Sequence, residues 1–530
     1  MSLAPGLSRL FMDFCASEPA ALKFCASAAQ HNWQQQPAVP AHRAELARLV
    51  AGQNPLPAVA GQVAAFEQGA GAVVTGQQVS LFGGPLFTPF KAATAVARAR
   101  QATAAGHPHT AIFWLASEDH DFAEIDHVTF PAARELVKLS YSPTRAGAPA
   151  AAVPVGGVVL DESITALVDR AAEILGASDA MDALAEAYRP GRTFAQAFAD
   201  FYRKVFAAQR LLVVDASGRD FHRLGAPVLQ AAIERADEFH RALIERNQAL
   251  EAAGYHAQVA VADQSSLLFL IDSETGARQA LKRTPASASE PDGLWQAGAH
   301  TCSTADLVGI LEAEPERISP SALLRPVFQD YLFSTSQIVG GPAEIAYFAQ
   351  SAVLYERILG RQTPAAPRFS ATLIEPQTAE LLRRHELALD RIFAEDAGSL
   401  ARLLAARAMP IETKRNLAAA GNALDEELTT LVDWMQSQDK GLGQSAETAA
   451  SKMRYQMDRL RTLAANFQLQ RESTLTRHAN VIAQSLFPGG VMQERVHGAA
   501  FYLARYGLEL IETVARQAEN ACPGHTAIWL

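Results

Sequence analysis

Residues 73–99 read VVTGQQVSLFGGPLFTPFKAATAVARA, and this stretch decides the fold. A short apolar run with a β-branched bias stops at a glycine-containing loop, and a helical pattern follows from about Leu86 to Arg100. Residues 111–128, AIFWLASEDHDFAEIDHV, repeat this order, because an apolar run again ends in a loop of polar residues. Strand–loop–helix units of this kind place ligands at the carboxyl ends of parallel strands. The sequence therefore predicts an α/β fold with a mostly parallel sheet and a site at one edge of it.

The loop after the first predicted strand offers groups that suit a phosphate or a substrate. Its glycines permit unusual φ angles and close backbone approach, and its glutamines offer amide donors and acceptors. The helix that Pro85 opens would point its positive end at the loop, and Lys91 lies about two turns into that helix. Because the pattern fits neither standard phosphate motif, a tight turn whose glycines serve geometry alone is the alternative. The candidates from this stretch are Thr75, Gly76, Gln77, Gln78, Gly83, Gly84 and Lys91.

The second loop is dense in carboxylates and histidines. Glu118, Asp119, His120 and Asp121 directly follow the apolar run. Carboxylates crowded at a strand end repel each other, which raises pKa values and supplies candidate general acids or bases. The same residue types are metal ligands, but His120 and His127 have no third histidine nearby, which makes a weak zinc signal. A solvated acidic loop is the alternative.

A third strand–glycine–helix unit is predicted at residues 336–350, SQIVGGPAEIAYFAQ. Gly340 and Gly341 form its loop, Pro342 opens its helix, and Glu344 falls in the first helical turn. The carboxyl ends of parallel strands meet at one edge of a sheet, so we expect this loop to face the same crevice as the other two.

Two further candidates lie outside these loops. Arg325 could clamp a carboxylate or a phosphate with its planar guanidinium, and a surface ion pair is the alternative. His256, in GYHAQV at residues 254–259, is predicted at a junction of helix, turn and strand. A hydrogen-bonded structural histidine is the alternative there.

Charge and cysteine content restrict the class of protein. The net charge of −10 over 530 residues argues against nucleic acid or an anionic membrane as the main partner. The four cysteines show no CxxC spacing, which favours a reducing compartment over a disulfide framework. The start of the sequence lacks a secretory pattern, and no apolar run approaches the ~20 residues of a transmembrane helix. The sequence therefore predicts a soluble cytoplasmic protein.

The α/β pattern extends over residues 1–375. Helices are predicted at 194–209 and 223–253, between several of the strands. Insertions into this core are predicted at about 130–200 and 262–300, where shorter strands and turns occur. The strand candidates are Ala72–Thr75, Ala111–Leu115, Leu211–Asp215, Gln258–Val261 and Ser334–Val339.

Residues 376–484 predict a long α-helical coiled-coil arm. Leucines and methionines there recur at heptad spacings, and Pro410 and the glycines around Gly441 mark turns between helices. Such an arm either packs on itself as an antiparallel hairpin or pairs with a second copy, and the two are compatible. Residues 485–530 are predicted to return to the core. The heptad positions are Leu417, Leu424, Leu428, Leu431, Met435, Met453, Met457, Leu460, Ala464 and Phe467.

Five segments in order resemble the bacillithiol-biosynthesis cysteine-adding enzymes, the BshC family. Two are VTGQQVSLFGGPLFTPFKA and FWLASEDHDFAEIDHV, which contain the first and second loops. The others are GYHAQV, SALLRPVFQDYLFSTSQIVGGPAEIAYFAQ at 321–350, and SLFPGGVMQERVHGAAFYLARYG at 485–507. The resemblance therefore covers nearly the whole chain.

The resemblance implies both an architecture and a reaction. The architecture is a Rossmann-type core with inserted connecting pieces, similar to class I aminoacyl-tRNA synthetases, with a coiled-coil arm that forms a homodimer. The reaction is amide formation between L-cysteine and the amine of glucosaminyl-malate, the last step toward bacillithiol. The cysteine carboxylate would be activated by ATP or another adenine nucleotide. A carboxylate needs activation because it is a poor acceptor for an amine near neutral pH.

The resemblance also implies roles for the candidate residues. The loops at 75–78 and 83–84 would hold phosphate or substrate, and residues 118–121 would bind the cysteine amine or act as base. Arg325, Gly340, Gly341 and Glu344 would complete the pocket. The sequence departs from the synthetases in two places. Their lysine-rich phosphate loop has no counterpart, since PRFS at 367–370 offers Arg368 alone, and their HxGH signature is not reproduced.

Two other functions are consistent with the same residues. One is a metal-dependent hydrolase or transferase that uses the cluster at 118–121 without ATP. The other is a non-catalytic dimeric scaffold whose Rossmann pocket holds a nucleotide. The sequence decides neither whether ATP or a metal is used nor which acid or histidine is the base.

Overall fold

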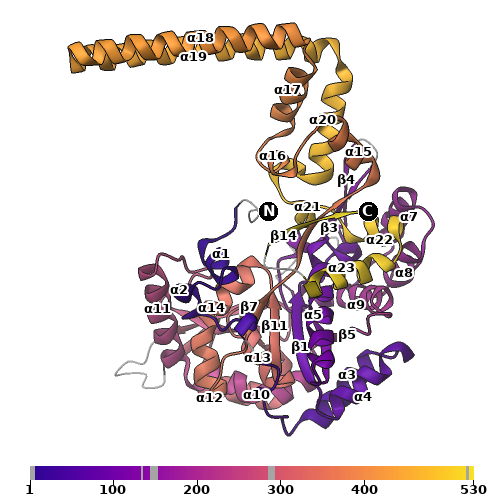
Figure 1. The fold of residues 1–530 in the computed structure, drawn as a ribbon. Coiled ribbons are helices and arrows are strands. Elements are labelled where there is room, and N and C mark those ends of the chain that lie inside the picture. The colour runs from indigo at the N-terminus through magenta and orange to yellow at the C-terminus, as the bar shows by residue number, and fades with distance from the viewer. Residues whose placement is uncertain (1–5, 31, 133–134, 144–152, 285–292, 521–523) are drawn as a thin grey trace. The chain divides into compact units, whose positions relative to one another are not determined.

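The computed structural model describes residues 6–30, 32–132, 135–143, 153–284, 293–520 and 524–530 (Figure 1). The chain divides into two compact units. Unit 1 comprises the described residues up to Ala132, Leu136–Ala371 and Glu494–Thr526. Unit 2 comprises mainly Thr372–Gln493. Unit 1 is therefore built from segments on both sides of unit 2 in the sequence.

A five-stranded sheet forms the centre of unit 1, and all neighbouring strands in it run parallel. The central strand carries the first loop, with Val74 opposite Ile338 on one side and Ile112 on the other. The predicted α/β fold with a parallel sheet is confirmed. In sheet order the strands are β12 (Ala365–Pro367), β11 (Thr335–Gly340), β1 (Gly71–Gln77), β2 (His109–Leu115) and β5 (Leu212–Asp215).

Helices cover both faces of this sheet, which explains why the strands are apolar runs without alternation. Val74 and Ile112 face a core cluster that includes Phe66 and Phe328. Phe113 points to the opposite face, where its ring lies 5.0 Å from that of Tyr202. The main helices of unit 1 are α3 (Arg43–Gln53), α4 (Ala60–Glu67), α5 (Phe87–Ala104), α9 (Phe194–Val205), α10 (Arg219–Glu234), α11 (Ala236–Ala252), α13 (Arg325–Phe333), α14 (Pro342–Leu359), α22 (Ala499–Tyr506) and α23 (Glu509–Asn520).

Two local predictions for unit 1 are wrong. The predicted helix at 223–253 is two helices, α10 and α11, which meet at Arg235. No strand forms at 258–261, because a side chain rather than a neighbouring strand satisfies the backbone there. Val259 N–H donates to Gln350 Oε1, and Gln350 Nε2 donates to the Val259 carbonyl, both at 2.9 Å.

The segment at 262–300, which the sequence predicts as an insertion, supplies most of a second, antiparallel sheet. Its strands in sheet order are β10 (Ile318–Pro320), β6 (Ser265–Ile271), β7 (Arg278–Thr284), β8 (Leu294–Ala297) and β9 (His300–Cys302). The segment at 130–200 holds a hairpin, β3 (His127–Pro131) with β4 (Leu136–Ser140), and then α7 (Ser163–Leu175) and α8 (Asp179–Ala187). Residues 144–152 of that segment lie outside the described residues.

Unit 2 is mainly helical, apart from the parts of β13 (Ser370–Ile374) and β14 (His525–Trp529) that belong to it, and two long helices form an antiparallel hairpin (Figure 1). The turn lies at Asp439, whose side chain accepts a hydrogen bond from Leu442 N–H at 2.8 Å. The predicted turn at Gly441 is wrong by two residues, because the glycines lie inside the second helix. A Cβ on Gly443 would lie 2.3 Å from Gln436 Cγ, so this glycine permits close helix approach. The longer helices are α15 (Pro376–Arg384), α17 (Ala397–Ala408), α18 (Ile411–Gln438), α19 (Lys440–Arg471) and α20 (Ser473–Leu486).

In the described part of the chain, no helix combines the length and apolar character that crossing a membrane requires.

Candidate functional site

A cavity of about 480 Å³ in unit 1 lies where the parallel strands end. Gly76 and Gln77 close β1, Ala116 follows β2, and Gly341 follows β11, so all three predicted loops reach this cavity. Phe87, Trp114, Tyr347 and Phe348 add aromatic walls. The structure therefore brings the three loops together at one edge of the sheet. The sequence candidates that line the cavity are Gly76, Gln77, Gln78, Lys91, Asp119, Arg325, Gly341 and Glu344.

The structure places the remaining candidates outside the lining of this cavity. They are Thr75, Gly83, Gly84, Glu118, His120, Asp121, His256 and Gly340. Thr75 is fully buried, and its hydroxyl donates to the Val339 carbonyl at 3.0 Å. Asp121 and His256 are exposed. A Cβ on Gly340 would lie 2.7 Å from the Phe348 ring, so that glycine serves packing.

Gly83 and Gly84 serve the geometry of the turn, which was the alternative interpretation. Both have positive φ, at 83° and 72°. A Cβ on Gly83 would lie 2.5 Å from Phe201 Cε1. The Gly83 N–H donates to Tyr188 Oη at 3.1 Å, and its carbonyl accepts from the Tyr202 hydroxyl at 2.8 Å. The protein therefore already uses the backbone N–H of Gly83 that a phosphate would need.

Lys91 connects two loops through hydrogen bonds and does not serve as a ligand for an anion. Its side chain is 2% exposed, and Nζ donates to Glu344 Oε2 at 2.6 Å and to Gln77 Oε1 at 3.0 Å. It also donates to the Gly76 carbonyl. An ammonium has three donors, so these bonds use all of them. Glu344 in turn accepts from the Gly341 N–H at 2.7 Å, which caps α14. Lys91 thereby fixes the end of β1 against the start of α14.

Glu118 is buried and faces His222, so it is not a proton donor or acceptor at the cavity surface. Glu118 Oε1 lies 3.3 Å from His222 Nε2, and His222 Nδ1 lies 3.1 Å from the Ile318 carbonyl. Burial alone would raise the pKa of Glu118, but the charge and hydrogen bond of His222, together with the charges of Arg325 and Arg278, leave the pKa below its usual value. Burial would lower the pKa of His222, but Glu118 raises it. Together they form a buried ion pair behind the loop.

The Glu118–His222 pair is expected to make the stability of unit 1 depend on pH. The raised pKa of His222 stabilises the folded protein fully below its unfolded value of 6.5, and this contribution is lost as pH rises through the folded pKa. The lowered pKa of Glu118 stabilises fully above its unfolded value of 4.5 and is lost as pH falls through the folded pKa. The stability that His222→Gln removes should therefore be largest between pH 4.5 and 6.5 and decline above pH 6.5.

Urea denaturation of wild type and His222→Gln at about pH 5.5 and about pH 8.5 measures this difference. His256→Gln, at an exposed histidine, is the control and should show no such difference. A loss of stability in His222→Gln that is the same at both pH values would contradict the ion pair.

Asp119 presents an ionised carboxylate to the cavity. Burial alone would raise its pKa, but Arg325, a hydrogen bond from Gln78 and other donors hold the pKa below its usual value. Gln78 Nε2 donates to Asp119 Oδ2 at 2.7 Å, and the His120 N–H donates to Oδ1 at 2.7 Å. The expected upward pKa shift from crowded carboxylates is therefore wrong for both Asp119 and Glu118, because cations and donors surround them. A carboxylate of this kind suits a bound ammonium group better than proton transfer.

His120 belongs to a neighbouring contact rather than to the cavity lining. Its Nδ1 lies 3.2 Å from Arg278 Nη1. A guanidinium can only donate, so Nδ1 of His120 accepts this hydrogen bond. The Arg278 guanidinium also stacks on the Phe269 ring, 3.6 Å from its centroid. His120 therefore helps to fix Arg278 beside the acidic loop.

Arg325 and Arg495 supply positive charge at the cavity, and Arg368 is a third arginine in its lining. Arg325, which begins α13, has a buried Nε–H with no hydrogen-bond partner among the described residues. Arg495, on α21 (Gln493–Val496), lines the same cavity, and burial together with the charge of Arg368 lowers its pKa. Sequence analysis missed Arg495, although SLFPGGVMQERVHGAAFYLARYG, which carries the resemblance, contains it. The cavity therefore combines the ionised carboxylate of Asp119 with arginines that can receive anionic groups.

No group of three or more His, Cys, Asp or Glu side chains in the described ranges is gathered so as to hold a metal ion. His120 and His127, the two candidate metal ligands, make separate contacts. His120 Nδ1 accepts from Arg278, whereas His127 Nδ1 lies 2.8 Å from Asp126 Oδ1.

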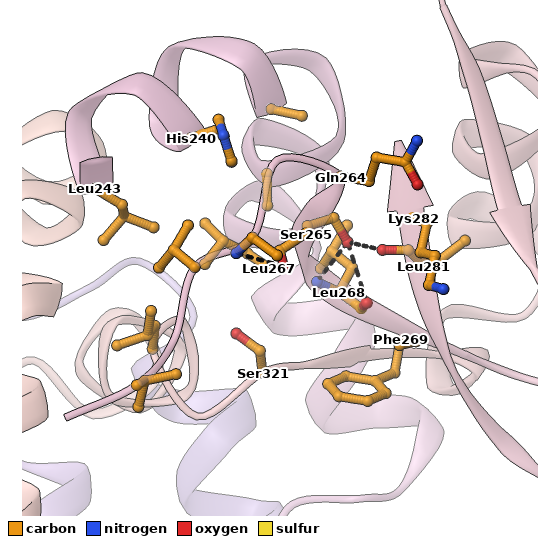
Figure 2. A pocket seen from close by; sticks show the side chains of 18 of the residues that line it. His240, Leu243, Gln264, Ser265, Leu267, Leu268, Phe269, Leu281, Lys282 and Ser321 are labelled. Atoms are coloured by element: carbon orange, nitrogen blue, oxygen red, sulfur yellow. Dashed lines mark hydrogen bonds between the residues drawn. The ribbon is translucent and has the colours of Figure 1, made fainter. Parts of the chain in front are cut away.

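A second cavity in unit 1, of about 600 Å³, was not predicted and contains none of the sequence candidates (Figure 2). Its wall is mainly apolar, and it lies between α11, β6 and β7, with His240 and Ser321 at its edges. The Ser266 hydroxyl donates to the Leu281 carbonyl at 2.6 Å. Among the described residues, Ala322 is the one that lines both cavities. Because the described wall of the second cavity lacks the gathered acids and arginines, the first cavity is the candidate functional site.

Comparison with known families agrees with the two parts of the chain. Residues 2–369 match the model of the BshC N-terminal Rossmann-like domain of bacillithiol biosynthesis, and residues 371–530 match that of the C-terminal coiled-coil domain. The chain belongs to the BshC family. The predicted Rossmann-type core with a coiled-coil region and the resemblance stated from the sequence are thereby confirmed.

Curated members of the BshC family are similar over most of their length. A protein of Koribacter versatilis (strain Ellin345) is 42% identical over 466 residues, 87% of this chain and 84% of that protein. One of Solibacter usitatus (strain Ellin6076) is 34% identical over 92% of this chain and 89% of its own length. One of Salinibacter ruber (strain DSM 13855 / M31) is 29% identical over 98% and 96%. Each is named "Putative cysteine ligase BshC".

Proposed function

We propose that this chain is a cysteine ligase that joins the carboxyl group of L-cysteine to the amine of glucosaminyl-malate, the last step of bacillithiol biosynthesis. The observation that carries the proposal is the charge pattern of the candidate site. Asp119 offers an ionised carboxylate, while Arg325 and Arg495 offer positive charge in the same cavity. The names of the BshC relatives support the same reaction class.

The two substrates carry groups that complement this pattern. Cysteine has an ammonium group for Asp119 and a carboxylate for an arginine. The malate part of the second substrate has two carboxylates, which suit the remaining guanidinium groups. The new bond forms between the sugar nitrogen and the cysteine carbonyl carbon, while a carboxylate oxygen leaves with the activating group and the amine loses a proton. The exposed Glu124, which lines the cavity, is a candidate acceptor for that proton.

An adenine nucleotide fits the donors of this cavity. Arg325 and Arg495 would hold its phosphates, beside the N-terminal end of α14, where the helix dipole favours an anion. ATP, or another adenine nucleotide, would supply the leaving group that a carboxylate lacks. Lys91 has no donor to spare for a phosphate, so the arginines replace the lysines of a standard phosphate loop.

The direct test is product formation by the purified chain. Incubation with L-cysteine, glucosaminyl-malate and ATP is expected to yield the cysteinyl amide, detected by mass spectrometry. Reactions that lack each component in turn are the controls, and they identify which nucleotide is consumed. Absence of product with active controls, across pH and added divalent metals, would refute the ligase.

The arm of unit 2 supports assembly as a homodimer, which we include in the proposal. Trp434, Leu460 and Phe467 on the hairpin are each more than half exposed, at 58%, 56% and 60%. Large apolar side chains along a long helical hairpin suit pairing with a second copy.

Leu460→Asp with Phe467→Asp is expected to convert a dimer into a monomer, because each buried carboxylate would have no partner. Analytical ultracentrifugation of the full chain measures the mass. Lys452→Asp, at an exposed residue of the same helix, is the control and should stay dimeric. A wild-type chain that sediments as a monomer at micromolar concentration would contradict this assembly.

A further inference from the structure

Arg368 and Glu494 form an almost fully buried ion pair at the wall of the candidate site. Arg368 follows β12, and Glu494 lies on α21 beside Arg495. Arg368 Nη2 donates to Glu494 Oε1 at 2.6 Å, and each side chain is 4% exposed. Buried ion pairs are weak evidence for stability, because desolvation can exceed the attraction. Because Arg368 also lines the cavity, the pair can act on a ligand bound there.

The Glu494 carboxylate is ionised and held in one orientation by donors. Its Oε1 also accepts from the Ser370 hydroxyl at 3.0 Å, and its Oε2 accepts from the Ala371 N–H at 3.1 Å. Burial alone would raise the pKa of Glu494, but the charge and hydrogen bond of Arg368 outweigh it and leave the pKa below its usual value. His525 Nδ1 lies 2.7 Å from the Ser370 oxygen, which fixes the hydroxyl from the other side.

His525 carries no positive charge near neutral pH, so it does not compete with Arg368 for the charge of Glu494. Burial is the main cause that lowers its pKa to about 4. The imidazole is therefore neutral. Because the Ser370 proton goes to Glu494, Nδ1 of His525 acts as the donor to Ser370. The single negative charge of Glu494 is thus directed at Arg368.

Arg368 is fixed on two sides and still has donors to spare. Its Nη1 donates to the Phe369 carbonyl at 2.9 Å, while Nη2 is held by Glu494. The described residues accept only these two hydrogen bonds, which leaves Nε–H and one proton on each terminal nitrogen. Nε lies 3.4 Å from the position that a Cβ on Gly341 would take, at the start of α14. One edge of the guanidinium therefore adjoins the glycine turn that lines the cavity.

We propose that Glu494 is a positioning residue, which holds the Arg368 guanidinium at the cavity wall so that its remaining N–H groups receive an anionic group of the substrate. Ser370 and His525 support Glu494 from behind. The proposal rests on the proposed function only in taking that anion to be a carboxylate of the malate group. It explains why this charge pair is buried at the site rather than replaced by apolar side chains.

The test measures malate binding by the full chain, with titration calorimetry and malate alone as the probe. Glu494→Gln keeps the shape of the side chain but removes its charge. It also places an amide NH2 group next to groups that themselves donate hydrogen bonds. We expect it to weaken malate binding about tenfold, by analogy with the loss of about 10- to 100-fold that follows when the hydrogen-bond partner of a metal ligand is removed. In the ligation assay the KM for glucosaminyl-malate should rise by a similar factor while kcat changes less. Glu494→Asp, which retains the charge, should recover part of the loss.

Two controls separate positioning from general stability. Glu512→Gln breaks another ion pair of unit 1, in which Arg100 donates to Glu512 at 2.8 Å, and it should leave malate binding unchanged. In an Arg368→Ala background, Glu494→Gln should have no further effect on malate binding, because the group it positions is gone.

Three results would overturn the proposal. The first is a folded Glu494→Gln chain that binds malate as wild type does, and the second is an undiminished effect of Glu494→Gln in the Arg368→Ala background. The third is a wild-type chain that binds no malate. If Glu494→Gln does not fold, Glu494→Asp carries the test, and unchanged malate affinity in that variant overturns the proposal. Failure of the proposed function is distinct, because it appears as a missing cysteinyl product whatever malate binding shows.

Discussion

Arg325→Ala is expected to lower kcat/KM for the ligation about 100-fold, the largest effect of any single substitution in the cavity. Arg325 begins α13, and its buried Nε–H has no acceptor among the described residues, so this donor can serve a ligand. Removing it leaves the anionic group of the substrate in the cavity without its partner. Steady-state kinetics with each substrate varied in turn will show which anion it binds.

Arg325→Lys and Arg317→Ala are the matched controls for this prediction. Lysine keeps the charge but loses the planar fork, so an intermediate loss is expected. Arg317 donates to the Ile271 carbonyl at 2.9 Å and to Glu314 and does not line the cavity, so its removal should leave the kinetics within about threefold of wild type. If Arg325→Ala also stays within that range, Arg325 is a structural residue and the proposed substrate orientation is wrong.

Lys91→Met is expected to destabilise unit 1 by about 3–5 kcal/mol, because it leaves a charged partner without its counter-ion in a largely buried site. Glu344 would lose its ion pair, and the Gly76 carbonyl and the Gln77 side chain would each lose a donor. The two units need not unfold together, so a single transition cannot be assumed. Replacing Trp434 and Trp529 by Phe leaves only the tryptophans of unit 1 to report urea unfolding by fluorescence.

The double variant Lys91→Met with Glu344→Gln tests the cause of this loss. Removing both charges should cost less than the sum of the two single substitutions, because neither ion is then left unpaired. A Lys91→Met chain whose stability stays within about 1 kcal/mol of wild type, but which no longer binds nucleotide or malate, would restore Lys91 as a ligand-binding residue.

The features that sequence reasoning predicted are local or follow from topology. The apolar runs that become β1, β2, β5 and β11 are long enough and sufficiently β-branched to be recognised. Parallel strands end at one edge, so Gly76, Asp119 and Gly341 had to approach each other once the sheet was assigned. The parallel order of the strands is enough for this prediction, without any distance between residues.

Partners that are distant in sequence decide the chemistry that could not be predicted. Glu118 is spaced like an active-site acid, but His222 turns it into one half of a buried ion pair. Lys91 is spaced so that it could reach an anion at the loop. In the structure its ammonium group instead donates to the Glu344 carboxylate. Arg495 carries no motif of its own, and only the fold brings it to the cavity.

Glycine and backbone patterns were also ambiguous without tertiary contacts. Gly83 was a candidate phosphate cradle, and only the position of Phe201 shows that its missing side chain makes room for a ring. The apolar run at 258–261 looks like a strand, yet Gln350 hydrogen-bonds its backbone and no neighbouring strand pairs with it. In both cases a single side chain from another segment overrides the local preference.

The discontinuous sequence of unit 1 has a consequence for how the chain matures on the ribosome. Roughly 120 residues of unit 2 separate Ala371 from Glu494. At about 5–20 residues per second, translation would need roughly 6 to 24 s to pass them. During that interval all five strands of the parallel sheet have been synthesised, but Arg368 lacks its counter-ion Glu494 and Arg495 has not yet been synthesised. A nascent chain at that stage therefore lacks two of the charged groups of the finished site, and the lining of the pocket is complete only after the arm has been made.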